Sequence, residues 1–548
     1  MTYDWKIKHK FDNDLLKQKQ IDLNLNDEEF FEFINHKTKL KSPKLLKNID
    51  KAVDRIQTAI LNDERIAICG DYDCDGITAT SIMMLGLLQL TTNVFFLIPD
   101  RVKDGYGISD NQVEECIRKQ ASLVITVDTG IAEHESIKKM IDAGIDVIVT
   151  DHHPWNTDTL PCEIVVDPFV DKNYAFPYIC GAMVAYKVIR ALIPEIKKID
   201  SDLNNQLIAL ASIATVADVM RLCDENRTFV YYGLKLVNRT KNFGLNALLD
   251  CLNLKNKEIS ETDVGFSIAP CINAVGRLEN AGQLVDMFLS DCEVEAEKIA
   301  QKAVKLNEKR KKLTSEIMDK VLPSNDPIVM QVFDSVPAGL LGVVANKISN
   351  KYQKPCFALV RGKGKYGGSG RSVFGYNISQ NITKNKDLDI DGGGHAEACA
   401  LSISENDFDE FKNRCFENYQ NFLDSGDCVK EPVLNVDFEI DFSSIDYELI
   451  DDINKLRPFG NGNDEVTFCT KNVEVVEKKV IGKKKNALRF VLKNSSNALQ
   501  AIVFNDLKDH YLECFDKCKF IDLVYTLTIN EFAGKKSIQI MPIDFKKS

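Results

Sequence analysis

From Arg65 onward the sequence repeats one pattern, in which a short apolar run is followed by an amphipathic segment. The apolar runs read RIAIC, NVFFLI, SLVITV, IDVIVT and EIVV, and the segments between them include DNQVEECIRKQ and EHESIKKMIDAG. Strands that are apolar along their whole length are buried on both faces, and helices between them make the neighbouring strands parallel. The sequence therefore predicts an α/β fold with a parallel sheet that helices cover on both sides.

The rest of the chain predicts several further domains. Its 548 residues suffice for three or four domains, because one domain usually spans roughly 100–200 residues. Strong helix formers without Gly or Pro continue from Cys292 to Val321 and predict one long helix. Short strands with turn signals near the end of the chain are typical of an OB-fold. We expect a polar appendage at 1–50 with a short helix at 27–35, the parallel-sheet domain at 51–290, a connector helix at 291–325, a second α/β domain at 326–425 and an all-β, OB-like domain at 431–548.

Composition excludes some classes of protein. With 44% apolar and 27% charged residues, the chain is typical of a soluble globular protein. No apolar run approaches the ~20 residues that a membrane span needs, and the start, MTYDWKIKHKFDND, lacks the apolar stretch of a secretory signal. We therefore expect a cytoplasmic protein without membrane contact, whose 16 cysteines are reduced. The net charge of −12 argues against coating nucleic acid with the whole surface, but it is compatible with a local basic channel.

Three aspartates alternate directly after the first apolar run. Asp71, Asp73 and Asp75 stand in GDYDCDG, where their mutual repulsion needs a compensating cation. A calcium EF-hand loop begins in the same way, but its twelfth position would here be Ile82 instead of glutamate, and a strand precedes it instead of a helix. A solvated acidic turn is the other alternative, although the run opens onto the apolar segment ITATSIMMLGLLQL. The pattern favours a metal site.

Polar residues also follow the later strands. Asp128 follows VITV, the triplet Asp151-His152-His153 follows VIVT, and Asp218 interrupts an apolar helical stretch. In an open parallel sheet the loops after the strands converge, so these side chains should meet in one cleft. An aspartate there can also simply cap a turn, and a histidine can simply pack. Several carboxylates with imidazole suit Mn²⁺ or Mg²⁺ better than Zn²⁺, and this many carboxylates predict two ions.

Other loops carry residues suited to phosphate. Arginine binds phosphate in a bidentate manner, and glycines before a helix expose backbone amides to an anion. Glycine turns are common, so each loop alone can also be structural. The basic runs at 309–312 and 483–485 fit either a solvated face or a nucleic-acid path, and near the second run Arg489 and the candidate stacking residue Phe490 follow. The candidates are Arg101 with the Gly105-Tyr106-Gly107 turn, Asn273 and Arg277 in NAVGR, Ser369, Arg371 and Ser372 in GSGRS, and the glycines of DGGGHAEACAL, which we expect to precede a helix.

Taken together, these motifs resemble a known family. GDYDCDG, VDTG, DHH and ATVADVM, in this order and spacing, are similar to the metal motifs of the DHH phosphoesterases, and GGGHAEACA resembles their second domain. PDRVKDGYG, INAVGRL, GSGRS, LRPFGNGN and the OB-like tail resemble the RecJ exonucleases, which degrade single-stranded DNA from 5′ to 3′. The resemblance spans roughly residues 50–548, and it departs at Cys74, where family members often have alanine.

The resemblance implies roles for individual residues. Asp71 and Asp73 would serve one Mn²⁺ or Mg²⁺ ion. Asp75, His152 and Asp218 would serve the other. Asp128 would bridge both ions, and His153 would lie near the scissile phosphate, so that the catalytic residues are Asp128, His152 and His153. The strand and its 5′ end would be held by Arg101, Tyr106, Asn273, Arg277, Ser369, Arg371 and His395.

The expected function is that of a 5′-to-3′ exonuclease specific for single-stranded DNA, in DNA repair and recombination. The resemblance also implies the domain order: a DHH domain, a long helix, a second α/β domain and an OB-like domain. The partners would be single-stranded DNA and a single-strand-binding protein or a helicase, with the chain as a monomer. Two alternatives remain: a DHH-family phosphodiesterase for short oligonucleotides or cyclic dinucleotides, which the OB-like tail disfavours, and an inactive DNA-binding replication scaffold, which the intact acidic set disfavours.

Overall fold

The structure is a computed structural model of the chain, which divides into two compact units. The larger unit is Lys39–Cys428, and the smaller one combines Met1–Thr38 with Val429–Ser548. The structure describes residues 3–101, 104–105, 107–154, 160–194, 200–426, 433–482, 485, 487–495, 497–504, 511–512, 518–532 and 534–548.

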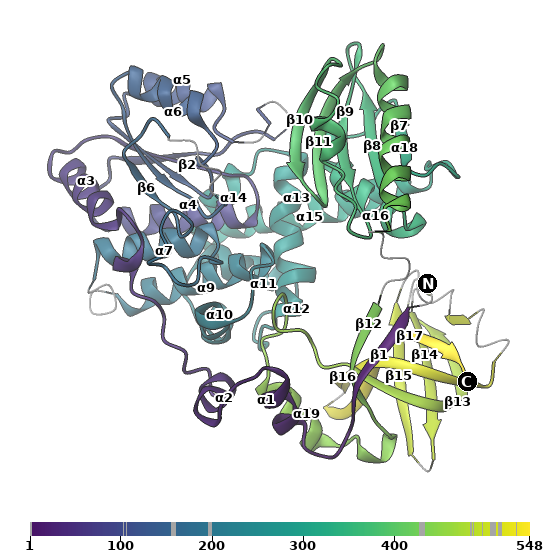
Figure 1. The fold of residues 1–548 in the computed structure, drawn as a ribbon. Coiled ribbons are helices and arrows are strands. Elements are labelled where there is room, and N and C mark those ends of the chain that lie inside the picture. The colour runs from purple at the N-terminus through teal and green to yellow at the C-terminus, as the bar shows by residue number, and fades with distance from the viewer. Residues whose placement is uncertain are drawn as a thin grey trace. The chain divides into compact units, whose positions relative to one another are not determined.

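The larger unit begins with the predicted parallel sheet. Its strand order is β3-β2-β4-β5-β6, and all four pairings are parallel. Ile66 and Ile68 of β2 belong to the core on one face, whereas Ala67 and Cys69 belong to the core on the other. Helices α5 and α6 cover one side of this sheet and α4 and α7 the other (Figure 1). The strands are β2 (Ile66–Gly70), β3 (Val94–Leu97), β4 (Leu123–Val127), β5 (Asp146–Thr150) and β6 (Ile164–Val166).

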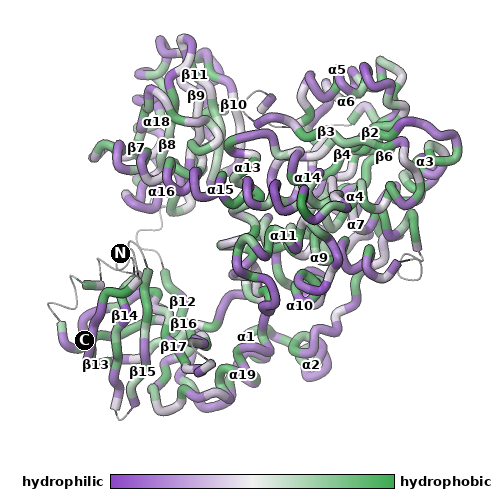
Figure 2. The backbone as a smooth tube through the Cα atoms, turned by 180° about the vertical axis from the view of Figure 1, so that it is seen from behind, coloured by the Kyte–Doolittle hydropathy of each residue, from purple (hydrophilic) through white to green (hydrophobic). Residues whose placement is uncertain are grey.

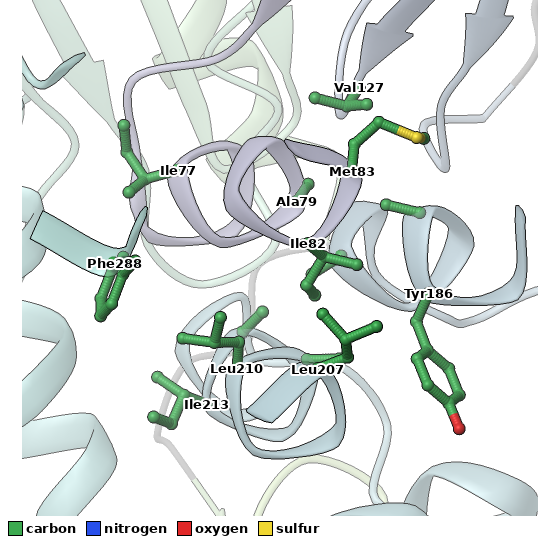
Figure 3. Close-up of a cluster of buried hydrophobic side chains, with 14 of the residues drawn as sticks. Ile77, Ala79, Ile82, Met83, Val127, Tyr186, Leu207, Leu210, Ile213 and Phe288 are labelled. Atoms are coloured by element: carbon green, nitrogen blue, oxygen red, sulfur yellow. The ribbon is translucent and has the colours of Figure 1, made fainter. Parts of the chain in front are cut away.

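Helix α4, which follows the acidic run, lies at the centre of the core. Figure 3 shows Met83 of α4 beside Val127 of β4, and Ile82 facing Leu207 and Leu210 of α9. In Figure 2 the hydrophobic residues follow the strands of the sheet and α4. Because α4 is packed on several sides, the loop at its start is held firmly in place. The helices are α3 (Ile49–Leu61), α4 (Cys74–Leu87), α5 (Asp110–Arg118), α6 (His134–Asp142), α7 (Gly181–Leu192), α9 (Ser201–Ala217), α10 (Asp224–Val237), α11 (Phe243–Cys251), α12 (Glu261–Asp263), α13 (Ala269–Leu278), α14 (Gly282–Leu289) and the connector α15 (Glu293–Met318).

A second α/β region follows the connector helix. Its five-stranded sheet has the order β10-β11-β9-β8-β7. Its strands are β7 (Val329–Phe333), β8 (Cys356–Arg361), β9 (Lys365–Arg371), β10 (Ile390–His395) and β11 (Ala398–Ser404). Its helical segments are the 3-10 turn η3 (Ala338–Leu340), α16 (Leu341–Tyr352), α17 (Gln380–Thr383) and α18 (Phe408–Asp424).

The two glycine-rich segments of this region are strands, so the expectation that they are loops, and that the second precedes a helix, is wrong. KYGGSGR forms β9, and GGGH ends β10, which pairs with β11 instead of preceding a helix. Gly394 has a φ of +150°, and a Cβ on it would lie 2.3 Å from the carbonyl oxygen of Ala398. Glycine is needed there because the backbones approach closely.

The smaller unit is a barrel-like β domain with helices at its side. Its sheet runs β1-β12-β13-β14-β15-β17-β16, and β13 also pairs with β16, which closes the strands β13 to β17 on themselves. The strands are β1 (Asp4–Lys10), β12 (Val433–Glu439), β13 (Phe468–Ile481), β14 (Ala487–Asn494), β15 (Asn497–Phe504), β16 (Phe520–Phe532) and β17 (Lys535–Lys547). The helices are α1 (Leu15–Asp22), α2 (Asp27–Ile34) and α19 (Tyr447–Lys455).

The structure differs from the sequence interpretation at two places in this unit. Residues 1–38 are part of the unit and not an independent appendage, because β1 pairs in parallel with β12 and Leu15 is buried in the β-domain core. Phe490 is only 1% exposed, so it packs in the core and is not a stacking residue. Lys483 and Lys484 lie outside the described residues. The other domain boundaries stay predictions.

Among the described residues, no helix combines the length and the apolar character needed to cross a bilayer.

Candidate metal centre

Hydrogen bonds fix the acidic loop to two helices. Oδ1 of Asp73 accepts the N–H groups of Asp75 (2.9 Å) and Gly76 (3.1 Å) and so caps α4. The two carboxylate oxygens of Asp75 accept the N–H groups of Gly181 and Ala182, each at 2.7 Å, at the start of α7. The loop folds back so tightly that a Cβ on Gly76 would lie 2.5 Å from the carbonyl oxygen of Asp71.

The predicted ligands meet at the carboxyl end of the sheet. Asp128 directly follows β4 and has a φ of +59°, and His152 follows β5 after Asp151. Asp218 caps the carboxyl end of α9 and so lies at its end, not within it. Ligand atoms within 4.8 Å of one another form three groups: Asp71, Asp73 and Asp128; Asp75, His152 and Asp218; and Asp128, His152 and His153.

The buried atoms of this centre fit a cation. Nε2 of His152 lies 3.1 Å from Oδ1 of Asp128, 3.6 Å from Oδ2 of Asp75 and 3.7 Å from Oδ2 of Asp218. Yet in the described part of the chain neither Oδ1 of Asp128 nor Oδ1 of Asp71 accepts a hydrogen bond. Buried acceptors without donors are costly unless a cation or water occupies the space between them. The converging oxygens and one imidazole are a donor set that suits Mn²⁺ or Mg²⁺.

The electrostatics of the centre point the same way. Burial, together with the charge of Asp73, raises the pKa of Asp71 to about 7. Burial and the charge of Asp75 raise the pKa of Asp218 to about 8, and the same two causes raise the pKa of Asp128. These carboxylates therefore resist carrying their charges together without a counter-ion. Divalent cations would reverse this by stabilising the ionised form.

His153 is oriented by its neighbour Asp151. Nδ1 of His153 lies 2.7 Å from Oδ1 of the fully buried Asp151, whose Oδ2 accepts the N–H of Ile131. Burial lowers the pKa of His153, but the hydrogen bond and the charge of Asp151 outweigh it and raise the pKa to about 9. Half of the His153 side chain is exposed, at 52%. Because Asp151 contacts Nδ1, Nε2 of His153 is the ring nitrogen left for a substrate beside the centre.

The predicted phosphate-binding residues of the first domain have different surroundings. The guanidinium of Arg101 lies 5.0 Å from the centre of the Tyr72 ring, within the acidic loop. Oδ1 of Asn273 accepts the N–H of Cys74 at 2.8 Å, so this side chain supports the acidic loop. Nη1 of Arg277 donates to the carbonyl oxygen of Gly339 at 3.2 Å, which joins α13 to the second α/β region. Tyr106 lies outside the described residues.

The remaining candidates form a second group in that region. Ser369 and Arg371 lie on β9, and a Cβ on Gly342 would be 3.0 Å from Nη2 of Arg371 and 3.6 Å from Oγ of Ser369. Gly342 belongs to the first turn of α16, so both side chains lie beside a helix amino terminus, which favours an anion. His395 is exposed at the end of β10.

The sequence reasoning missed two features, of which the first belongs to the centre and the second, Asp167, interacts with Asp151 and His153 but is in none of the three groups. The amides of Gly181 and Ala182 that hold Asp75 have no sequence signature. Asp167 directly follows β6, is 1% exposed, and has a pKa that burial raises to about 8. The signal for Asp167 is the same as for Asp71 and Asp128, because it is an acidic residue at the carboxyl end of an apolar run, here EIVV.

Comparisons with known families match the three folded regions. The profile described as DHH family, N-terminal domain matches residues 65–215, the DHHA1 domain matches 325–421, and the RecJ OB domain matches 436–544. These matches place the chain in the DHH class of proteins, and the carboxylate–histidine centre lies within and directly after the region that the DHH profile matches.

Individual relatives identify one family within this class. The single-stranded-DNA-specific exonuclease RecJ of Salmonella typhimurium is 30% identical over 528 residues, which cover 90% of this chain and 90% of that protein. RecJ of Bacillus subtilis is 34% identical over 507 residues, 90% of this chain, but the chain spans only 63% of that relative's length. The chain belongs to the RecJ family.

Solved structures agree with this assignment. RecJ of Thermus thermophilus in complex with Mn²⁺ matches with a TM-score of 0.80 at 24% identity, over 100% of this chain and 80% of that one. An exonuclease RecJ bound to manganese matches with a TM-score of 0.61 at 31% identity, over 69% of this chain and 95% of that one.

Proposed function

We propose that this protein is an exonuclease that hydrolyses single-stranded DNA from the 5′ end with two divalent metal ions. The observation that carries the proposal is the meeting of buried carboxylates with His152 at the ends of β2, β4 and β5. The family membership and the OB domain support DNA as the substrate. The protein would act in DNA repair and recombination in the cytoplasm, as a monomer, with a single-strand-binding protein or a helicase as partner.

The side chains divide between two ions. Asp71 and Asp73 would hold one, and Asp75, His152 and Asp218 the other. Asp128 would serve both ions; its membership of the group with Asp71 and Asp73 and the 3.1 Å between its Oδ1 and Nε2 of His152 support this role. Two such ions would lower the pKa of a bound water and neutralise the charge of the attacking and leaving oxygens. The RecJ structure that is 31% identical to this chain is bound to manganese, and Mn²⁺ or Mg²⁺ fits the donors here.

The chain's own groups orient the substrate. His153, held as a donor by Asp151, would bind a nonbridging oxygen of the scissile phosphate. Arg101, which lies beside Tyr72, would bind a phosphate near the acidic loop. Tyr106, five residues further along the chain, and Asn273, which contacts the acidic loop, would also bind the strand there.

The direction of digestion needs a pocket for one end of the strand. Arg371 and Ser369 beside the first turn of α16, with Arg277 and His395, would hold the 5′ phosphate. The metal centre by itself carries no direction, because a two-metal site cuts any phosphodiester brought to it.

The test uses one 3′-labelled strand in four forms. The strand carries a 5′ phosphate or a bulky 5′ block, is annealed into a duplex, or is shortened to a dinucleotide. We expect stepwise shortening of the unblocked single strand alone, dependent on Mn²⁺ or Mg²⁺ and absent in Asp128→Asn. Preferred cleavage of the dinucleotide would favour a short-oligonucleotide phosphodiesterase, and binding without cleavage would favour an inactive scaffold.

A further inference from the structure

One exposed aromatic side chain packs against two other aromatic rings, close in the chain to residues of the metal centre. Tyr178 is 41% exposed, although its ring makes edge contacts with Phe169 (5.9 Å between centroids, 84°) and Phe176 (5.6 Å, 67°). The guanidinium of Arg221 lies 5.1 Å from the centre of the Tyr178 ring. In the described part of the chain Arg221 forms no ion pair with a carboxylate. Both Tyr178 and Arg221 are thus exposed to the solvent.

A buried amide fixes this pair. Nδ2 of Asn226, which is fully buried, donates to the carbonyl oxygen of Tyr178 at 2.7 Å and to that of Arg221 at 3.1 Å. One side chain thus joins the segment before α7 to the segment after α9. The two exposed groups are therefore held in a defined relative position, as a binding surface requires.

Both members of the pair adjoin residues of the metal centre in the chain. Tyr178 precedes Gly181, whose N–H binds Asp75, by three residues, and Arg221 follows Asp218 by three residues. Three residues span at most about 10 Å, so the pair lies on the rim of the centre. A strand whose scissile phosphate is at the metals would pass within reach of this rim.

We infer that Tyr178 and Arg221 form a nucleotide subsite, in which one base of the strand stacks on the Tyr178 ring and Arg221 binds the adjoining phosphate. The inference rests on the proposed function. It goes beyond that function because it assigns substrate binding to two residues that belong neither to the metal motifs nor to the proposed 5′-phosphate pocket. Aromatic rings stack on any base, which suits an enzyme that must accept every sequence. Because the guanidinium of Arg221 lies over one face of the Tyr178 ring, the base would stack on the other face, and the positive charge of Arg221 would attract the adjoining phosphate.

The experiment measures binding in the Asp128→Asn background, where the strand is not cleaved, and KM and kcat with an intact centre. Tyr178→Ala should weaken affinity and raise KM by roughly tenfold. Its kcat should change little, and Tyr178→Phe should restore affinity because it keeps the ring. Arg221→Gln should weaken affinity and reduce the slope of log affinity against log salt by about one. Tyr232→Ala is the matched control, since Tyr232 is 50% exposed on α10.

An abasic nucleotide moved along the strand identifies the stacked base. At one position it should weaken binding of the Asp128→Asn protein but not of the same protein with Tyr178→Ala, because the two changes remove the same contact. Equal affinity of the Tyr178→Ala and parent proteins, or a loss in Tyr178→Phe as large as in Tyr178→Ala, would overturn the subsite while leaving the nuclease proposal intact. If the unmodified protein neither binds nor cleaves the strand, the proposed function itself fails, and the subsite with it.

Discussion

At the scale of single residues, the centre brings together acids that destabilise one another. Asp75 and Asp128 are 2% and 5% exposed, and Asp71 is held nearby by the same loop. Proteins keep such arrangements where a ligand compensates them, since perturbed pKa values gather at functional sites. The centre therefore costs stability whenever its cations are removed.

This cost predicts how the metal-free protein responds to pH. The pKa values of Asp71 and Asp218 are raised in the folded state to about 7 and about 8, above the value of about 3.9 expected when unfolded. The folded state then binds more protons, so the free energy of unfolding falls as pH rises from about 4 to about 8. In EDTA we expect Tm to fall by several degrees between about pH 5 and about pH 8, measured by calorimetry.

Two controls accompany this measurement. Mn²⁺ should raise Tm most at the alkaline end, where its ligands carry their charges. Asp128→Asn removes one of the repelling charges, so its metal-free Tm should depend less on pH and respond less to Mn²⁺. A metal-free Tm that rises from pH 5 to pH 8 would contradict the assignment of these carboxylates.

At the scale of elements, the amino terminus of α4 depends on a neighbouring helix. Asn273 of α13 accepts the N–H of Cys74, and a Cβ on Gly276 of the same helix would lie 2.6 Å from the carbonyl oxygen of Tyr72. Helix α13 thus packs against the acidic loop itself. The segment NAVGR consequently has a positioning role in addition to any contact with DNA.

Removing this support should lower stability measurably. Asn273→Ala leaves the N–H of Cys74 without its acceptor, and a buried donor without a partner costs about 1–3 kcal/mol. Urea unfolding should show this loss, whereas the exposed Asn62→Ala should behave as the unmodified protein. An unchanged unfolding midpoint together with weaker DNA binding would instead assign Asn273 to the substrate alone.

At the scale of the whole molecule, the smaller unit is built from both ends of the chain. Strand β1 adds to β12, and Leu15 of α1 packs with Phe438 and other core residues of the β domain. A truncation meant to remove the β domain must therefore remove residues 1–38 as well.

Two truncations test this organisation. Residues 39–428 should fold and remain soluble. They should bind single-stranded DNA more weakly than the full chain does, and their affinity should depend less on salt, because the lysine–phosphate contacts that release counterions are removed with the smaller unit. Residues 1–430 should be less soluble, because β1 and the apolar side of α1 lose their partners. Anisotropy titrations at several salt concentrations give the affinities. Equal affinity of 39–428 and the full chain at every salt concentration would show that the smaller unit does not bind DNA.

The sequence by itself determined the parallel sheet, the long connector, the β strands of the tail and the convergence of the predicted metal ligands. These follow from local patterns: apolar runs set the strands, and the carboxyl ends of parallel strands converge whatever the details of packing. Asp71, Asp128 and His152 could be placed together for this reason, though they are far apart in the chain.

Only the tertiary structure decided the features that depend on distant contacts. Glycine runs carry no side-chain periodicity, so nothing local distinguishes strands β9 and β10 from loops. β1 pairs with a strand more than four hundred residues away, which no local pattern records. Closure of the barrel decides which face of β14 is buried, and Phe490 lies on that buried face. The position of Tyr178 at the surface is fixed by contacts with Phe169, Phe176 and the side-chain amide of Asn226. These contacts exist only after the chain has folded.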